Sequence, residues 1–374
     1  MNTAADRYND CMQDKFRMLN GQTLPYPIFF PDATRGFVRE LSFDDIKKIG
    51  LPGILVNTFH LLKEQGYEKT ETAGGVRPMI GWDGAIISDS GGFQVMSIAK
   101  RGGGRITDEG VVFVIDGVEH LLTPEESIRY QLTMRTDLCV VLDDFTPIDA
   151  TREEAEETVR RTTLWARRCK DEFERIWKER ADTGVRPYVI GVVQGGEYED
   201  LRRESMKGLM EIGFDGYGYG GFPMKDGKFD EKMAGLIARE VKGRTRGSAP
   251  TLLYGLGIGK PDDIVKCVKL GWQIFDCVLP TRDARHGRLY VYTNESIQRI
   301  DVNKNGFYKY YNPRHASHLE EDMPVSRACD CELCTTISRK ELARMWRAKD
   351  RRVLRLATIH NLRFYAILME KLRQ

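Results

Sequence analysis

Residues 138–193 read LCVVLDDFTPIDATREEAEETVRRTTLWARRCKDEFERIWKERADTGVRPYVIGVV, and this stretch decides the fold class. Two short apolar runs rich in β-branched residues, typical of buried strands, flank a long polar segment. Between Thr151 and Gly184, side chains suited to a buried stripe recur every three or four positions, namely Ala155, Val159, Thr162, Trp165, Cys169, Phe173 and Trp177. This spacing predicts one long amphipathic helix that stops at Gly184. The stretch therefore predicts a strand, a helix and a strand.

The same alternation runs through most of the chain. Eight apolar runs are predicted strands, at residues 26–30, 53–59, 85–90, 138–144, 187–193, 217–221, 251–257 and 274–279. Thr123, with Glu126 three residues later, predicts the start of another helix, and KPDDIVKCVKLG predicts a third that stops at Gly271. Eight such units favour an α/β fold, a (β/α)8 TIM barrel, although a doubly wound open sheet would give nearly the same pattern.

Length and composition suit one large barrel with an appendage. The chain has 374 residues, of which 41% are hydrophobic, and the alternation of strands and helices ends near Asn303. We expect a barrel core with the catalytic site over residues 1–302, a zinc-binding subdomain over 303–360, and a C-terminal helix over 361–374 that packs back on the barrel.

The lengths of the apolar runs and the scattered cysteines indicate an intracellular protein. The N-terminal residues lack the apolar stretch of a secretion signal, and no apolar run approaches the roughly 20 residues that span a bilayer, so we expect a cytoplasmic protein without a membrane partner. The scattered cysteines are expected to be reduced and mostly buried; they are Cys11, Cys139, Cys169, Cys267 and Cys277.

The net charge is only +2, yet residues 339–374 hold eleven Lys or Arg and three acidic residues. This local excess is either a phosphate-binding surface or a solvated helix face.

The spacing Cys329-x-Cys331-x2-Cys334, followed after 25 residues by His360, predicts a metal site. Three thiolates and one imidazole complete the tetrahedral shell of one zinc ion, which indicates a structural zinc. A catalytic zinc is disfavoured, because no ligand position would remain for water. The alternative is a core histidine near three cysteines that bind no metal.

Aspartates end three of the predicted strands, where barrel enzymes carry their catalytic residues. Asp89 ends one strand, Asp143 and Asp144 end the next, and Asp276 lies within the last. Carboxylates in apolar surroundings need a partner or a function, so helix caps and buried ion pairs are the alternatives. Two placed carboxylates would support displacement at a sugar anomeric carbon through a covalent intermediate.

Glycine pairs accompany these aspartates and allow close approach of a flat ligand. They are Gly91-Gly92, Gly195-Gly196 and Gly220-Gly221, and Phe93 could stack on the same ligand. GLGIGK at residues 255–260 lacks the Lys-Ser/Thr ending of a phosphate loop and the full dinucleotide spacing, so it indicates a strand-to-helix turn.

The chain carries six sequence motifs in a fixed order. They are SDSGGFQVMS, VVQGG, GYGYGG, GIGKPDD, FDCVLPTR and the cysteine–histidine set. Six ordered motifs resemble those of tRNA-guanine transglycosylases over nearly the whole chain. The resemblance implies a barrel enzyme, commonly a homodimer, that exchanges guanine at the wobble position of a G-U-N anticodon in tRNA for a 7-deazaguanine, without a redox cofactor or nucleoside triphosphate.

The resemblance also implies roles for individual residues. Asp276 matches the nucleophile and Asp89 the general acid/base. The base-binding positions are Phe93, Asp143, Gln194, Gly221, Phe222 and Leu256, and the tRNA-contacting positions are Lys260, Arg282 and Arg285.

Three departures from the bacterial pattern concern the base pocket. Residues 220–226 read GGFPMKD where GGLAVGE is usual, Phe145 stands where a cysteine is usual, and Leu256 replaces an expected methionine. The leading hypothesis is insertion of the aminomethyl-deazaguanine precursor of queuine. A queuine-salvaging enzyme, a noncatalytic tRNA-binding partner subunit and, last, a DNA-directed relative are the alternatives.

Overall fold

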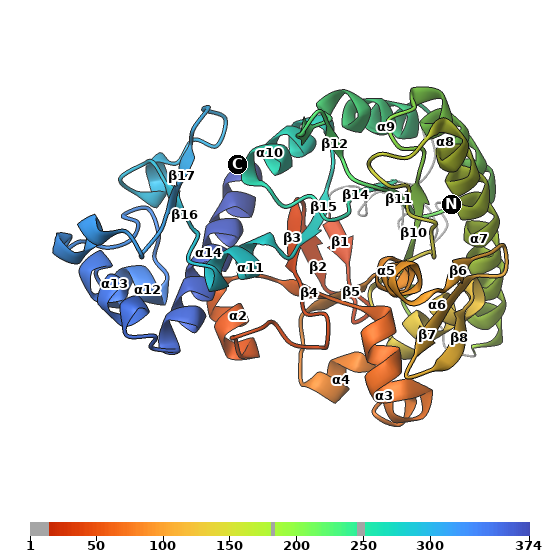
Figure 1. The fold of residues 1–374 in the computed structure, drawn as a ribbon, viewed down its shortest axis with the longest axis horizontal. Coiled ribbons are helices and arrows are strands. Elements are labelled where there is room, and N and C mark those ends of the chain that lie inside the picture. Colours follow the sequence, from red (N-terminus) through yellow and green to blue (C-terminus); the bar gives the residue numbers. More distant parts are fainter. Residues whose placement is uncertain (1–14, 181–183, 245–250) are drawn as a thin grey trace, which may run out of the picture.

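Eight parallel strands form the barrel in the computed structural model, which describes residues 15–180, 184–244 and 251–374 (Figure 1). They are β3 (Ile28–Pro31), β4 (Gly53–Val56), β5 (Ala85–Ser88), β9 (Leu138–Val140), β10 (Tyr188–Val193), β11 (Gly216–Tyr219), β14 (Leu252–Gly255) and β15 (Ile274–Cys277). The order is β3-β15-β14-β11-β10-β9-β5-β4, and a parallel bridge between Asp32 and Leu55 joins β3 to β4. The eight predicted strands and the predicted barrel are confirmed, because an open sheet would leave its first and last strands apart.

Helices follow the strands and cover the outside of the barrel. They are α2 (Phe43–Ile49), α3 (Thr58–Thr72), α4 (Val76–Ile80), α5 (Gly92–Gly102), α6 (Pro124–Met134), α7 (Arg152–Glu179), α8 (Glu199–Ile212), α9 (Glu231–Arg244), α10 (Pro261–Leu270) and α11 (Leu279–Arg285). Thr123 caps α6 through the Glu126 amide, as predicted, and Gly271 ends α10 in the left-handed conformation. The long helix is also confirmed, but it ends at Glu179 rather than Gly184, because Arg180 takes an extended backbone.

Short antiparallel strands lie outside the eight-stranded barrel, and they were not predicted from the sequence. After α5 comes a three-stranded sheet of β6 (Arg105–Ile106), β7 (Val111–Ile115) and β8 (Val118–Leu122). Two hairpins pair β1 (Lys15–Arg17) with β2 (Thr23–Pro25) and β12 (Met224–Lys225) with β13 (Lys228–Phe229). Such short strands carry too few residues for a clear period-2 pattern.

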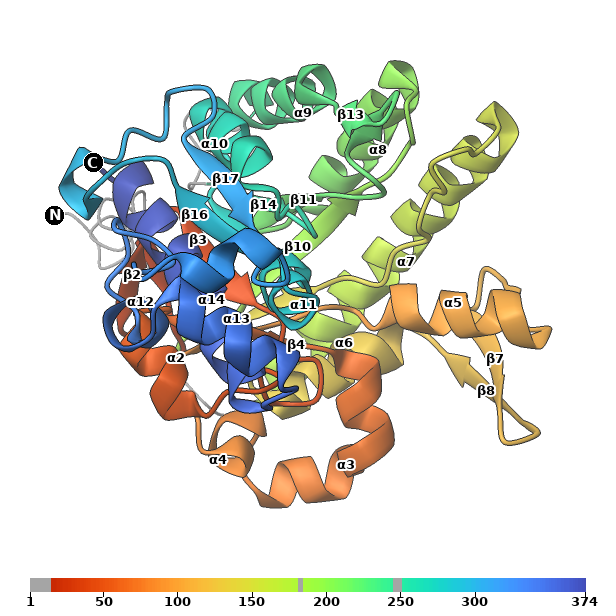
Figure 2. The ribbon, with the colours of Figure 1, turned by 60° about the vertical axis from the view of Figure 1, so that its left-hand side comes forward.

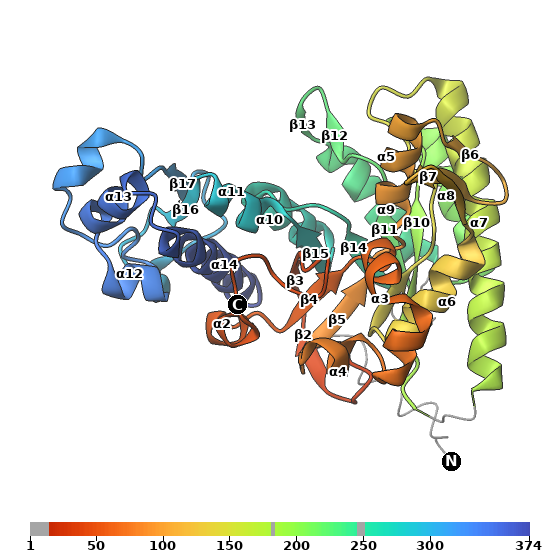
Figure 3. The ribbon, with the colours of Figure 1, turned by 60° about the horizontal axis from the view of Figure 1, so that its bottom comes forward.

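About the last quarter of the chain forms a lobe beside the barrel, drawn in blue in Figures 1 and 3. Its elements are β16 (Leu289–Tyr292), β17 (Tyr308–Tyr311), the 3-10 turns Ile297–Arg299 and Ala316–Glu320, α12 (Glu332–Thr336), α13 (Arg339–Arg347) and α14 (Arg352–Leu372). The expected boundary at residue 303 falls between the paired strands β16 and β17, and that at 360 falls inside α14. We therefore propose that the lobe begins at β16 and shares α14 with the barrel.

Helix α14 joins the two parts (Figure 2). Its side chains are buried along most of its length, the Tyr365 ring packs 4.6 Å from that of Phe29 in β3, and the Tyr365 hydroxyl donates to the Gly259 carbonyl. Within the described residues, no helix is long and apolar enough to span a bilayer. The predicted buried, free cysteines are confirmed for Cys139, Cys169, Cys267 and Cys277, whereas Cys11 lies outside the described residues.

The buried carboxylate of Asp137 connects several elements at the amino-terminal end of the barrel. Asp137, immediately before β9, accepts hydrogen bonds from the Leu19 amide and the Ile86 amide, both at 2.7 Å, and from the Arg77 guanidinium at 2.6 Å. It therefore links β9 to β5, to α4 and to the segment after β1.

We predict that Asp137→Ala lowers the free energy of unfolding by about 3 kcal/mol, because a buried amide, a partly buried amide and a mostly buried guanidinium lose their acceptor. Urea unfolding measures the loss. Asp83→Ala is the matched control, since it removes an exposed ion pair with Lys47 and should change stability little. Equal effects of the two substitutions would contradict this role for Asp137.

Candidate active site and metal centre

A cavity of about 280 Å³ opens at the carboxyl ends of the barrel strands. Seven of the predicted site residues line it, namely Asp89, Phe93, Asp143, Gly221, Phe222, Leu256 and Asp276. Gln194 lies fully buried behind the cavity. The volume is near the lower end of the roughly 300–1,000 Å³ range of ligand pockets, so it suits a single base better than a whole nucleotide.

Asp276 lies in β15. One of its carboxylate oxygens accepts hydrogen bonds, whereas the other has no hydrogen-bond donor among the described residues. Its Oδ1 accepts hydrogen bonds from the Tyr254 hydroxyl at 2.8 Å and from the Gly257 amide at 3.0 Å. Burial raises the pKa of Asp276 to about 6, while these two donors oppose the rise. Asp276 is therefore an oriented carboxylate that ionises just below neutral pH.

Asp89 follows β5 and is held by three donors. Its Oδ1 accepts from the Thr58 amide at 3.1 Å and the Gly91 amide at 3.0 Å, and its Oδ2 accepts from the Asn57 side chain at 2.7 Å. Burial and, to a smaller extent, the charge of Asp276 raise the pKa of Asp89 to about 7, against the three donors. The two carboxylates thus interact electrostatically across one cavity and titrate in neighbouring pH ranges.

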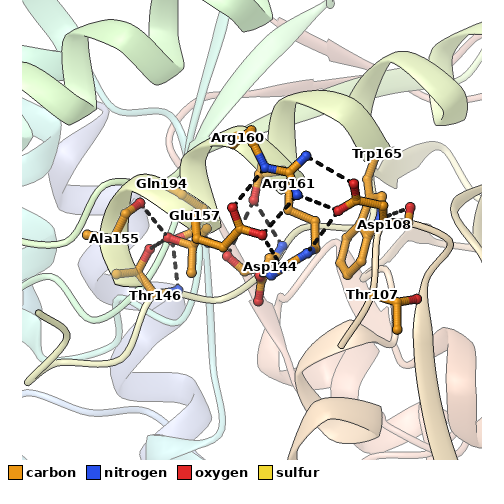
Figure 4. Close-up of polar contacts among 12 residues, drawn as sticks. Thr107, Asp108, Asp144, Thr146, Ala155, Glu157, Arg160, Arg161, Trp165 and Gln194 are labelled. Atoms are coloured by element: carbon orange, nitrogen blue, oxygen red, sulfur yellow. Dashed lines mark hydrogen bonds and ion pairs between the residues drawn. The ribbon is translucent and has the colours of Figure 1, made fainter. Parts of the chain in front are cut away.

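The adjacent acidic residues Asp143 and Asp144 have different environments. Asp143 lines the cavity and accepts from the Gln194 amide nitrogen at 2.6 Å, and burial raises its pKa to about 7. Asp144 turns away to pair with the Arg161 guanidinium on α7, as Figure 4 shows. Asp143 is therefore available to a ligand, whereas Asp144 is the buried ion pair that the sequence left as an alternative.

The absence of a side chain at Gly220 leaves room for the Gln194 side chain beside Asp143. The Gln194 amide oxygen accepts from the Thr146 backbone at 3.2 Å, and a Cβ on Gly220 would lie 2.6 Å from the Gln194 amide nitrogen. Gly221 has a φ of +75°, which L side chains rarely adopt. This glycine pair thus has a steric reason to be here.

Three phenylalanines form a chain of edge-on contacts along the cavity. The rings of Phe93 and Phe145 are 5.0 Å apart, and those of Phe145 and Phe222 are 5.1 Å apart with an interplanar angle of 89°. Phe93 and Phe222 are each about half exposed. These rings give a flat ligand an apolar surface on which to stack.

Sequence reasoning missed several residues that position the site. Arg202 of α8 is buried and donates to the Val193 carbonyl at 2.5 Å and the Gly220 carbonyl at 2.8 Å, so it joins the ends of β10 and β11. A single arginine in an amphipathic helix gives no signal of this. Tyr254, in an apolar strand, could have been recognised, because a buried tyrosine hydroxyl needs a partner, and the polar pair Asn57 and Thr58 after β4 could have been recognised in the same way as Asp89.

The three predicted RNA-contacting residues lie outside the cavity. Lys260 is exposed at the start of α10, and Arg282 and Arg285 lie on α11, directly after the strand that carries Asp276. One Nη of Arg285 is buried without a hydrogen-bond partner among the described residues. Burial and the nearby Arg39 lower the pKa of Arg285, so an anion near this guanidinium would be stabilised.

The predicted metal ligands come together in the lobe. Cys329, Cys331, Cys334 and His360 are buried, and their ligand atoms all lie within 4.8 Å of one another. The Sγ atoms of Cys331 and Cys334 are 3.5 and 3.3 Å from His360 Nδ1, close to the roughly 3.6 Å that tetrahedral zinc bond lengths require.

The His360 ring is oriented for metal binding from its other side. His360 Nε2 lies 2.8 Å from the Tyr290 carbonyl oxygen and can donate to it, which leaves Nδ1 as the ligand atom. Four protein ligands and no open position fit a structural zinc ion, as the sequence predicted.

Known sequences match the chain over nearly its whole length. The sequence model of the family described as "Queuine tRNA-ribosyltransferase" matches residues 15–374. A queuine tRNA-ribosyltransferase of Psychrobacter sp. (strain PRwf-1) is 38% identical over 355 residues, which cover 93% of this chain and 85% of the relative. That of Shewanella sp. (strain W3-18-1) is 37% identical over 353 residues, covering 94% and 87%.

We predict that Cys331→Ala lowers the bound zinc to well below one equivalent and lowers thermal stability, because a structural site loses one of four ligands. Atomic absorption of the purified protein measures the zinc. Cys267→Ala, which removes a buried cysteine of α10 outside the cluster, should retain the metal. A full equivalent of zinc in Cys331→Ala would show that this thiol is not a ligand.

Proposed function

Because the chain belongs to the queuine tRNA-ribosyltransferase family and is therefore a pentosyltransferase, we propose that it exchanges guanine at the wobble position of G-U-N tRNAs for a 7-deazaguanine. The observation that carries this proposal is the pair Asp276 and Asp89, two held carboxylates with raised pKa values facing one base-sized cavity. The same pair speaks against a noncatalytic partner subunit, which would not need both carboxylates.

The reaction proceeds in two balanced steps. In the first, ionised Asp276 attacks the ribose anomeric carbon, the bond to guanine N9 breaks, and protonated Asp89 gives its proton to that nitrogen. In the second, the Asp89 carboxylate takes the N9 proton of the incoming base, and that nitrogen displaces Asp276 from the anomeric carbon. One glycosidic bond is broken and one is formed, and both carboxyl groups return to their starting states.

The pocket residues divide the recognition of the base. Asp143 and Gln194, hydrogen-bonded to each other at 2.6 Å, bind the polar edge of the purine, and the backbone at Gly221 contacts its carbonyl. Phe93 stacks on one face, with Leu256 and Phe222 contributing the remaining apolar surface. Buried polar groups of this kind reject ligands that leave them unpaired.

The RNA is held by cations beside the nucleophile. Arg282 and Arg285 on α11, with Lys260, contact the anticodon loop, where splayed bases and phosphates accept fork-shaped donors. The buried Nη of Arg285 that has no partner among the described residues supports this role. We also propose that the enzyme acts as a homodimer.

The incoming base is, in our leading proposal, the aminomethyl-deazaguanine precursor. Beside Met224 lies a second cavity of about 170 Å³, which shares Tyr219 and Phe222 with the base pocket and is lined by the carboxylates of Glu197, Asp226 and Asp230. Lys225 also lines this cavity and pairs with Glu197 at 3.5 Å, so three carboxylates against one ammonium favour a substituent that carries an amine. The added volume specifically favours the second candidate, queuine, whose substituent is larger.

Release of radiolabelled guanine from a G-U-N tRNA tests the reaction. We expect wild type to release guanine on addition of a deazaguanine and Asp276→Ala to lose at least 10³-fold in rate, because no nucleophile remains. Unchanged circular dichroism and zinc content establish that the variant is folded. Full activity of Asp276→Ala would exclude the proposed nucleophile.

The same assay separates the two bases. A higher kcat/KM for the aminomethyl base supports the leading proposal, whereas a higher value for queuine identifies the salvage enzyme. Release with neither base from folded, zinc-loaded protein would exclude both.

We also predict a bell-shaped dependence of kcat/KM on pH with its maximum between about 6 and 7. Asp276, with a pKa of about 6, must be ionised and is lost as a nucleophile as pH falls below that value. Asp89, with a pKa of about 7, must hold its proton and loses it as pH rises further. A profile that stays flat from pH 5 to 9 would contradict these roles.

A further inference from the structure

A cationic groove lies on the lobe, away from the base pocket. It has a volume of about 680 Å³ and is bounded by the end of α11, by residues 286–288 just before β16, by β17 and by residues within 312–318. Its exposed cationic side chains include Arg288, Lys309 and Arg314, with Arg339 partly buried at its edge. His286 extends the groove toward α11.

The charge of this groove is largely uncompensated. Its single acidic lining residue, Asp283, accepts a hydrogen bond from the Tyr290 hydroxyl at 2.7 Å and lies 3.9 Å from the Arg288 guanidinium. In the described parts of the chain, no carboxylate lies within 4.0 Å of Lys309 or Arg314. An anion from outside the chain would therefore meet at least two unpaired cations.

Several basic residues of the segment 339–374, unlike Lys309 and Arg314 of the groove, are paired with carboxylates of the chain. Several of its arginines form ion pairs within the fold, namely Arg339 with Glu321, Arg352 with Asp350, Arg355 with Asp45 and Glu332, and Arg363 with Asp330 and Glu370. These four arginines, among the eleven cations of the segment, therefore stabilise the fold through internal ion pairs, and the groove beside the segment adds exposed cations of its own.

Aromatic rings hold the groove's guanidinium groups in place. The Arg288 guanidinium lies 5.1 Å from the centroid of Tyr310, a ring that is 49% exposed, and that of Arg314 lies 5.3 Å from Trp346. The buried Tyr311 hydroxyl lacks a hydrogen-bond partner among the described residues. Preoriented forks, an exposed ring and an unpaired hydroxyl are the groups that bind phosphodiesters and unstacked bases.

We propose that this groove binds the phosphodiester backbone of the substrate RNA at nucleotides outside the one exchanged, an inference that rests on the proposed function. Helix α11 connects the two sites, since it begins just after the strand of Asp276 and ends beside His286, which lines the groove. Seven helical residues span about 10 Å, a distance that an RNA strand covers in about two nucleotides. A small free anion would need only one such cation cluster, not an open groove with an exposed ring.

The test is a triple variant, Arg288→Ala, Lys309→Ala and Arg314→Ala. The matched control removes three exposed lysines elsewhere, Lys178→Ala, Lys207→Ala and Lys304→Ala, for the same change in net charge. Binding of a full-length G-U-N tRNA is titrated at several salt concentrations, and kcat and KM for guanine release are measured with that tRNA and with a short RNA limited to the anticodon loop.

We expect the groove variant to bind the tRNA at least 10-fold more weakly, with a salt slope smaller by about 2 to 3, since each phosphate contact contributes about 0.7–0.9. KM should rise for both RNAs while kcat is retained, because nucleotides about two positions from the exchanged base belong to the anticodon loop. The control triple should change affinity less than about 2-fold. Lys309→Gln alone should lower the slope by about 1, which provides a milder variant should the triple be poorly folded.

Three results would overturn the inference. If wild type exchanges guanine but the groove variant binds tRNA with unchanged affinity and slope, the groove is not an RNA site, and the proposed function stands. If the groove variant changes the oligomeric state, the face is an interface between copies. If wild type shows neither exchange nor tRNA binding, both the inference and the proposed function fail. Groove-dependent tRNA binding without exchange would instead support the groove as an RNA site and exclude the proposed transferase activity.

Discussion

The closure of eight parallel strands is the constraint on which the rest of the structure depends. The parallel bridge between Asp32 and Leu55 joins β3 to β4, and closure brings β15, β3, β4 and β5 into one continuous arc. Asp276 on β15 and Asp89 after β5 consequently face the same cavity although 187 positions separate them in the chain. Each carboxylate is then partly buried, and this burial, with the charge of Asp276 acting on Asp89, raises their pKa values to about 6 and about 7, as the proposed nucleophile and acid would need.

The metal centre contributes to the same site through one helix. His360 reaches the cysteine cluster from α14, and the next residue, Asn361, donates to the carbonyls of Pro280 and Arg288 at 3.0 and 2.9 Å. Those carbonyls lie at the start of α11 and just after its end, so the position of α14 determines how α11 presents its arginines. A structural zinc in the lobe would therefore affect the proposed RNA binding through the position of α11 rather than through chemistry.

The proposed base pocket combines a fixed polar edge with an apolar surface. Asp143, Gln194 and the buried Arg202 form the rigid side, where hydrogen bonds leave little freedom. Phe93, Phe145 and Phe222 form the other side, and Phe222 also borders the cavity beside Met224. Under the proposed function, a substituent on the incoming base would meet an aromatic ring and carboxylates there, so this cavity would distinguish related bases.

The sequence by itself determined the eight barrel strands, the capped helices and the cysteine–histidine set, because apolar periodicity, capping residues and ligand spacing are local properties. It also indicated Asp89, Asp143 and Asp276 through their places at strand ends. Only the tertiary structure decided that Asp143 faces the cavity while Asp144 pairs with Arg161, that Arg202 joins two strand ends, and that Arg288, Lys309 and Arg314 form one groove. These features arise from contacts between residues far apart in the chain, and side-chain direction at a strand end depends on packing that no local pattern encodes.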